Sequence, residues 1–444
     1  MWGDQMYKYI NNYNKEELYN LAFYDQVTDL TNEKYFYKKL SEEIKNNKND
    51  KFAVLYLRFI NLIKLINLIG YKNSNNFIKE IADKIKSFRP EIELVSLYRG
   101  SQFLIFSKIN EEDKACFLMG KEINDLLNFL KNFIRQSGYS YILKSNIGVS
   151  IYPIHGKDAE AILSTTHHAM HLVDSTEDGY RIYDEKLFNK KLDNDSLKKA
   201  LEKSIERKEF YLKFQPKVRI DTEKIVTVEA LLRWKHPQRG EISPGRFIPM
   251  AEESGFIKNI GTWVLEESYK ILKRWISLNY REIKICVNIS SIELNDPEII
   301  RKIEEISNYY TVPNNLIELE ITESSFANIS KGVLNKLKEL GFLINLDDFG
   351  TGYSSLNYFG RFPIDILKLD KTFIDNINEW KTKALVETVI NLSHRFGIEV
   401  VAEGVENKTQ LNILRKLSCD YIQGYYFYKP LSIKELENLF VRKL

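Results

Sequence analysis

The sequence is poor in the features that mark secreted, disulfide-bonded or membrane-spanning proteins. Three cysteines occur in 444 residues, and Cys116, Cys286 and Cys419 lie far apart along the chain. Cysteines that are few, odd in number and widely separated indicate buried thiols in a reducing compartment rather than a disulfide framework. No apolar run approaches the ~20 residues that a membrane helix needs, and the N-terminus lacks a signal-peptide pattern. We therefore expect a cytoplasmic protein with no membrane segment.

An excess of charge of one sign is also missing. Lysine and arginine total 64 against 61 aspartates and glutamates, which gives a formal net charge of +3. This balance gives no bulk electrostatic reason to bind DNA, so we expect no DNA partner. Hydrophobic residues make up 44% of the chain and charged residues 28%, which is typical of globular protein. The length suggests roughly two or three domains.

One charged segment, residues 184–200, divides the chain into two patterns of secondary structure. We expect it to begin a helix capped by Asp193 or Asp195. Before it, strands and helices alternate in a compact α/β unit, which predicts a central sheet with flanking helices. The expected strands are 51–59 and 141–153, the hairpin is 93–107, and the helices are 75–88, 114–134 and 158–173.

After this segment, strands and helices alternate about eight times within roughly 245 residues. Strands are expected near 210–217, 225–232, 284–289, 316–321, 342–347, 365–369, 398–402 and 420, and helices near 246–254, 260–277, 298–309, 330–340, 382–396 and 407–417. Eight βα units of this total length fit a TIM-like (β/α)8 barrel, which needs roughly 250 residues. The predicted fold class is therefore α/β. It has an N-terminal helical segment (1–20), a first domain (21–186), a linker helix (187–200) and a barrel domain (201–444).

Acids and amides fall at the ends of the predicted barrel strands, the end of such barrels that carries the chemistry. They are Glu229, Asn288, Glu320, the pair Asp347 and Asp348, and Glu403. One acid at a strand end is ordinary surface, but six oxygen ligands on five strands are expected to converge. Converging carboxylates repel one another unless cations neutralise them, and oxygen ligands select Mg²⁺, Mn²⁺ or Ca²⁺ over zinc. Lys368 belongs to the same end of the barrel.

Eight ordered motifs resemble the EAL-domain phosphodiesterases of bacteria, which hydrolyse cyclic di-GMP to linear pGpG. The motifs span roughly 205–440 and read "EALLRW", "SPGRFIPMAEESGFI", "VNIS", "LEITES", "DDFGTGYSSL", "DILKLDKTFI", "VAEGVE" and "QGYYFYKP". The resemblance implies two divalent cations, Mg²⁺ or Mn²⁺, and a TIM-like barrel with one antiparallel strand. It also implies a role for each matching residue. The metal ligands would be Glu229, Asn288, Glu320, Asp347 and Asp348, with Glu403 holding a metal or its bridging water. Lys368 would assist the attacking water, Glu323 would anchor the loop after Asp348, and Gln215, Arg233 and Gln423 would contact the dinucleotide.

Residues 20–186 resemble a GGDEF domain, the diguanylate cyclase that makes cyclic di-GMP from GTP. The resemblance rests on "FYDQVTDLTN", "SNIGVSIYPIHGKDAEAIL" and "YRIYD", but the signature turn reads Arg99-Gly100-Ser101-Gln102-Phe103 and has lost both acids. Arg58 and Ile60 stand where the family has aspartates, and Ile66 and Asn75 where it contacts guanine. An arginine cannot ligate the metal that a cyclase needs. We therefore expect a degenerate GGDEF domain without cyclase activity.

Two functions remain open. The first is a metal-dependent cyclic di-GMP phosphodiesterase whose degenerate GGDEF domain has a regulatory or dimerisation role. The second is a receptor that binds cyclic di-GMP without cleaving it and acts through partner proteins. The complete acid set and Lys368 favour the enzyme, because a receptor has no need of ligands for two cations. In either case we expect a homodimer, formed through the barrel domain or the N-terminal segment.

Overall fold

The computed structural model divides the chain into two compact units, Met1–Asp195 and Ser196–Leu444. It describes residues 14–443 apart from 27, 47–49, 100–101, 110–114, 141–142, 174–177, 281, 327–328 and 351–359. Within the described residues, no helix combines the length and the apolar character needed to cross a membrane. Cys286 and Cys419 are buried free thiols, as expected. Most of the predicted N-terminal helical segment lies outside the described residues, which begin just before helix α2 (Lys15–Phe23).

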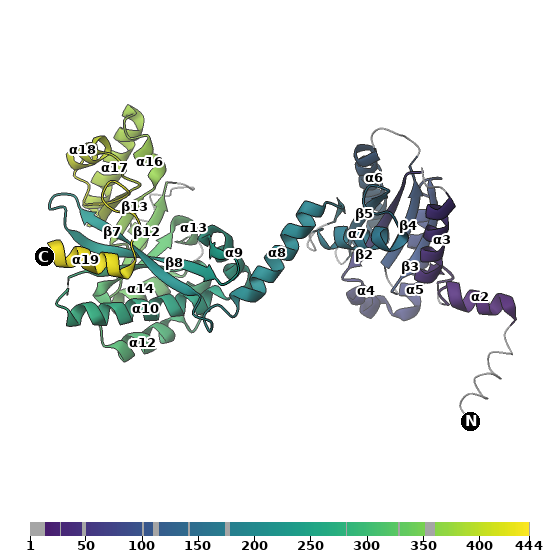
Figure 1. Ribbon diagram of the computed structural model, residues 1–444, viewed down its shortest axis with the longest axis horizontal. Helices are drawn as coiled ribbons and strands as arrows, with labels where there is room; N and C mark the ends of the chain where they lie inside the picture. The colour runs from purple at the N-terminus through teal and green to yellow at the C-terminus, as the bar shows by residue number, and fades with distance from the viewer. Residues whose placement is uncertain are drawn as a thin grey trace, which may run out of the picture. The chain divides into compact units, whose positions relative to one another are not determined.

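The first unit is built on a six-stranded sheet in the order β1-β3-β4-β2-β5-β6. Its strands are β1 (Thr31–Asn32), β2 (Phe52–Ile60), β3 (Ile92–Tyr98), β4 (Gln102–Lys108), β5 (Lys144–Tyr152) and β6 (Gly179–Ile182). Its helices are α2, α3 (Glu33–Asn46), α4 (Leu62–Ile69), α5 (Tyr71–Lys86), α6 (Ala115–Gln136) and α7 (Ala159–His171). Side chains of β2 alternate between two separate hydrophobic clusters, so both faces of the sheet are buried beneath helices. The predicted sheet with flanking helices is confirmed (Figure 1).

Helix α8 (Glu185–Leu201) spans the charged segment and begins earlier than the sequence suggested. The side chain of Asp184 accepts a hydrogen bond of 3.0 Å from the backbone N–H of Leu187, which places the start of the helix there. Asp193 and Asp195 lie inside the helix, so the expected cap is wrong. Leu197 and Leu201, near its C-terminal end, are buried in the core of the second unit.

The second unit is a closed barrel of eight strands, β7, β8 and β10 to β15, with β9 added to the edge of β8. The strands are β7 (Phe210–Arg219), β8 (Ile225–His236), β9 (Gly240–Ile242), β10 (Lys284–Asn288), β11 (Ile317–Thr322), β12 (Leu343–Phe349), β13 (Ile366–Leu369), β14 (Glu399–Glu403) and β15 (Tyr421–Gln423). Strand β7 runs antiparallel to both of its neighbours, β8 and β15, whereas β8 and β10 to β15 pair in parallel. The one antiparallel strand that the resemblance implied is therefore present.

Helices form the outer layer of this barrel (Figure 1). They are α9 (Pro244–Ser254), α10 (Ile257–Ser277), α11 (Ser291–Leu294), α12 (Ile299–Tyr310), α13 (Glu323–Phe326), α14 (Lys331–Glu339), α16 (Lys371–Asp375), α17 (Trp380–Arg395), α18 (Lys408–Lys416) and α19 (Ile433–Lys443). One continuous hydrophobic cluster joins strands to helices, with Trp234, Tyr269 and Trp275 among its largest buried side chains. This core fixes the strands, and the strands position the polar side chains that point into the barrel.

Candidate active site at one end of the barrel

Polar side chains from every barrel strand meet at the end of the barrel where the parallel strands finish. Strand alternation points one site residue of each strand inward, and parallel pairing places the strand ends at one rim. Asp348 directly follows Asp347 and joins the site where the backbone turns at its positive φ of 55°. The sequence predicted every member of this set, which consists of five acids, three amides and a lysine: Gln215, Glu229, Asn288, Glu320, Asp347, Asp348, Lys368, Glu403 and Gln423.

The ammonium group of Lys368 lies among four carboxylates. Its Nζ is 2.5 Å from Glu320 Oε1, 2.6 Å from Glu403 Oε1, 3.0 Å from Asp347 Oδ1 and 3.9 Å from Glu229 Oε2. Lys368 is only 1% exposed, so these contacts are shielded from water. The lysine that the sequence placed at a rim is therefore an internal cation of the acidic cluster.

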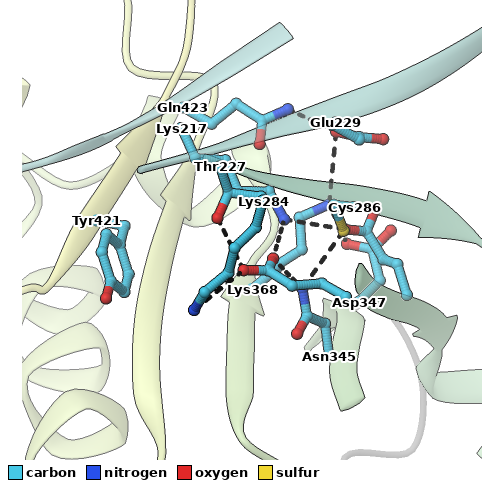
Figure 2. Close-up of polar contacts among 12 residues, drawn as sticks. Lys217, Thr227, Glu229, Lys284, Cys286, Asn345, Asp347, Lys368, Tyr421 and Gln423 are labelled. Carbon is cyan, nitrogen blue, oxygen red and sulfur yellow. Dashed lines mark hydrogen bonds and ion pairs between the residues drawn. The ribbon is translucent and has the colours of Figure 1, made fainter. Parts of the chain in front are cut away.

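Two amides hold the carboxylate of Glu229. Asn288 Nδ2 donates to Glu229 Oε1 at 3.0 Å. Gln423 Nε2 donates to Glu229 Oε2 at 2.6 Å, and Figure 2 labels both of these residues. All three residues were predicted for the site, and the structure brings them into direct contact. With both oxygens engaged, this carboxylate keeps one orientation.

The electrostatics of the cluster are dominated by carboxylates in a buried place. Burial disfavours the charged ammonium of Lys368, but the carboxylates of Glu229, Glu320, Glu403 and Asp347 outweigh it and raise the pKa of Lys368 well above its usual range. Burial, together with repulsion from neighbouring acids, raises the pKa of Glu403 to about 8 despite the opposing effect of Lys368. Burial raises the pKa of Asp348 as well, and repulsion from neighbouring acids adds to this effect, although Lys368 opposes it. The cluster therefore has more negative charge than the single ammonium of Lys368 neutralises.

The donor set fits hard divalent cations. Asp347, Asp348 and Glu403 each offer an oxygen, and these three oxygens lie within 4.8 Å of one another. At the site, the five carboxylates face one buried ammonium group, Lys368, which leaves a formal charge of −4. Two divalent cations would balance this charge. Among the described residues, Asp347 Oδ1 is buried and accepts no hydrogen bond, and its charged neighbour is the Lys368 ammonium 3.0 Å away.

Glu323 contacts the segment that follows the paired aspartates. Its Oε2 accepts a hydrogen bond of 3.0 Å from the backbone N–H of Gly350. Asp348, two residues before Gly350, has a positive φ of 55°. Few residues other than glycine adopt this conformation, so the backbone turns sharply there. The rest of the predicted loop, with Thr351, Ser354 and Ser355, lies outside the described residues.

Two cavities adjoin the acids. One of about 280 Å³ is lined by the predicted Gln215, Glu229, Glu403 and Gln423, together with Lys371, Gly404, Glu406, Gly424 and Tyr425. Arg233 is absent from this set and lines a second cavity of about 300 Å³, which Asn288 and Glu320 also border. Sequence reasoning missed Lys371 and the exposed ring of Tyr425, although each lies within three residues of a predicted one.

In the first unit, the positions expected to carry cyclase chemistry hold other groups. Arg58 in β2 pairs with Gln102 in β4, so an arginine and an amide face each other where metal-binding acids were expected. Gly100 and Ser101 at the tip lie outside the described residues. His167 and His171 of α7 lie near this place with their Nε2 atoms 3.3 Å apart, and His167 packs edge-on against Tyr56.

Comparison with known proteins agrees with this fold and site. The family model described as "EAL domain" matches residues 198–430, and the one described as "Diguanylate cyclase, GGDEF domain" matches residues 22–178. The signaling protein YkoW of Bacillus subtilis is 30% identical over 97% of this chain and 54% of its own length. The bifunctional diguanylate cyclase/cyclic di-GMP phosphodiesterase MucR of Pseudomonas aeruginosa is 30% identical over 95% of this chain and 62% of its own length. The chain thus spans little more than half the length of these curated relatives.

Solved structures resemble the barrel unit. The PaMucR phosphodiesterase in complex with c-di-GMP is 35% identical, with a TM-score of 0.52, and the match covers 54% of this chain and 99% of that one. The EAL enzyme Bd1971 with cAMP and cyclic-di-GMP bound is 32% identical over 56% of this chain and 69% of its own, with a TM-score of 0.53.

Fold and site together define a TIM-like barrel with an acidic site at the ends of its parallel strands. The chain belongs to the EAL-domain family, and a GGDEF domain precedes its EAL domain.

Proposed function

We propose that the barrel is a cyclic di-GMP phosphodiesterase, which hydrolyses its substrate to linear pGpG with the help of two divalent cations, Mg²⁺ or Mn²⁺. The observation that carries this proposal is the cluster of buried carboxylates around Lys368, whose formal charge of −4 calls for two such cations. The choice of cyclic di-GMP as substrate is supported by the similar MucR structure, which is a complex with c-di-GMP. The metal ligands would be Glu229, Asn288, Glu320, Asp347, Asp348 and Glu403.

Each group of the chain has a role in this reaction. Bound cations would polarise the phosphodiester and lower the pKa of a water molecule. Because its pKa is raised, Lys368 stays an ammonium at neutral pH, so it donates hydrogen bonds and stabilises negative charge rather than removing a proton. Gln215 and Gln423 line the cavity of about 280 Å³ in which one part of the dinucleotide would bind, and Arg233 lies at the adjoining cavity. Glu323 would hold the loop after Asp348 in place through Gly350.

The alternative is a receptor that binds cyclic di-GMP without cleaving it. Incubation of the protein with cyclic di-GMP and Mn²⁺, followed by chromatography, separates the two functions. The proposal predicts conversion to pGpG that EDTA abolishes. Substrate that persists at high protein concentration would contradict the enzyme and favour the receptor.

For the GGDEF domain we propose a regulatory role without catalysis, exerted through the geometry of a homodimer. Arg58 opposite Gln102 removes a metal site, and Ile66 and Asn75 remove expected guanine contacts. We therefore expect a dimer by light scattering and weak or no GTP binding by calorimetry of the full chain. Micromolar GTP affinity in the presence of magnesium would contradict the structural role and favour nucleotide sensing.

A further inference from the structure

A second polar cluster lies inside the barrel directly beneath the acids. Each of its members is two residues along a strand from a site residue, and therefore points inward as well. Lys217 lies beneath Gln215 on the antiparallel strand β7, and Glu318 lies beneath Glu320 on β11. We call this set the supporting cluster; it consists of Lys217, Thr227, Cys286, Glu318 and Asn345. Figure 2 labels all of them except Glu318.

The supporting cluster and the site meet at Glu320, whose two oxygens have different partners. Glu320 Oε1 faces the site and lies 2.5 Å from Lys368 Nζ. Glu320 Oε2 faces the supporting cluster, where Lys217 Nζ is 3.2 Å away and Cys286 Sγ donates to it at 2.8 Å. The carboxylate is thus held from below by an ammonium and a thiol, which leaves Oε1 directed at the site.

Lys217 in turn is held by Glu318. Its Nζ lies 3.4 Å from Glu318 Oε2, and both side chains are no more than 2% exposed. Glu318 also accepts hydrogen bonds from Thr227 Oγ1 at 2.8 Å and from Asn345 Nδ2 at 2.9 Å. Glu318 therefore serves Lys217 as a counter-ion one level below the site.

We propose that Lys217 is a positioning residue, which, held by Glu318, fixes Glu320 so that Oε1 alone is presented to a divalent cation. This inference rests on the proposed function, because it concerns the metal ligand set of the same site. Groups that orient a ligand from outside the metal's own contacts typically change metal affinity or activity by about 10-fold to 100-fold when they are removed. Lys217 and Glu318 are opposite charges, so they can be removed together without leaving a buried charge unpaired.

The test uses the full-length double variant Lys217→Met with Glu318→Gln. Calorimetry should show a dissociation constant for Mn²⁺ about 10-fold or more above that of the wild type. The Mn²⁺ concentration for half-maximal turnover should rise in parallel, and kcat at saturating Mn²⁺ should recover. The matched control is Lys284→Met, which removes a lysine 4.0 Å from Glu318 that has no contact with Glu320 among the described interactions. This control should bind Mn²⁺ as the wild type does.

A second variant covers the case in which the double variant fails to fold. Lys217→Gln keeps a hydrogen-bond donor beside Glu318 and Glu320 but removes the charge that holds Glu320 Oε2, and it should also weaken Mn²⁺ binding. Wild-type affinity for Mn²⁺ in a folded double variant, or in Lys217→Gln if the double variant does not fold, would overturn the role of Lys217 but leave the proposed function intact. A wild-type protein that binds no Mn²⁺ would overturn the metal site and this inference together.

Discussion

Replacement of Lys368 by methionine tests whether the acidic cluster depends on its internal cation. The side chain keeps nearly the same length but loses the charge that lies within 3.0 Å of Glu320, Glu403 and Asp347. In the metal-free protein, these buried carboxylates would then face one another without compensation. We expect a large loss of stability and a loss of turnover.

The size of the effect follows from burial. Removal of one partner of a buried ion pair costs about 3–5 kcal/mol. In a domain of this size, each kcal/mol lowers Tm by about 2–4 °C. The variant should therefore unfold roughly 6–20 °C below the wild type in EDTA. Saturating Mn²⁺ should recover much of this loss, since divalent cations bring positive charge to the same carboxylates.

Thermal unfolding with EDTA and with Mn²⁺ provides the assay, and the exposed Lys383 on α17 provides the control as Lys383→Met. The control should match the wild type under both conditions. A Lys368→Met protein with wild-type Tm in EDTA would refute the reasoning, as would an equal loss with and without Mn²⁺. Either result would show that Lys368 does not neutralise the cluster.

Other consequences concern the metals, the substrate and the degenerate turn. Glu229→Ala removes a carboxylate held by two amides and should abolish turnover in the chromatographic assay; a kcat near that of the wild type would count against the site. EDTA should inhibit reversibly, and Ca²⁺ should replace Mg²⁺ poorly because of its longer and looser coordination; full activity with Ca²⁺ would be the contrary result. Lys371→Ala should raise KM for cyclic di-GMP about tenfold at unchanged kcat, because Lys371 is the one cation among the described residues that line the cavity of about 280 Å³; steady-state kinetics would show an unaltered KM if it does not contact substrate. Ser101→Asp with Gln102→Glu should form no product from GTP while Arg58 remains, and a GTP-dependent product would contradict this account.

Much of the barrel could be predicted because its strands and helices alternate regularly. Strands β11 and β14 begin and end within one residue of expectation, since β11 alternates apolar and acidic residues and β14 is a short apolar run that ends at Glu403. Helix α4 was missed because its eight residues are apolar on more than one side: Leu62 and Leu65 are buried, whereas Ile63 and Leu68 are exposed. Only Lys64 and Asn67 are polar, and an apolar run of this length cannot be assigned to a helix or a strand by periodicity alone.

The acids of the site could be predicted from the sequence, but the supporting cluster beneath them could not. Carboxylates at strand ends attract attention, whereas Lys217 within a strand looks like an ordinary surface lysine. Its only local signal is the two-residue step from Gln215, which places both side chains on one face of β7. That Lys217 reaches Glu318 and Glu320, about a hundred residues away, depends on closure of the barrel, which no local pattern encodes.

The central claim is that this barrel hydrolyses cyclic di-GMP with a water molecule activated at its acidic end. Turnover of cyclic di-GMP in water enriched in ¹⁸O, with Mn²⁺ present, tests it directly by mass spectrometry of the product. The account predicts linear pGpG that carries one solvent ¹⁸O in its new terminal phosphate, and none of this product from the Lys368→Met variant. Substrate recovered intact, or a linear product without the label, would contradict the account.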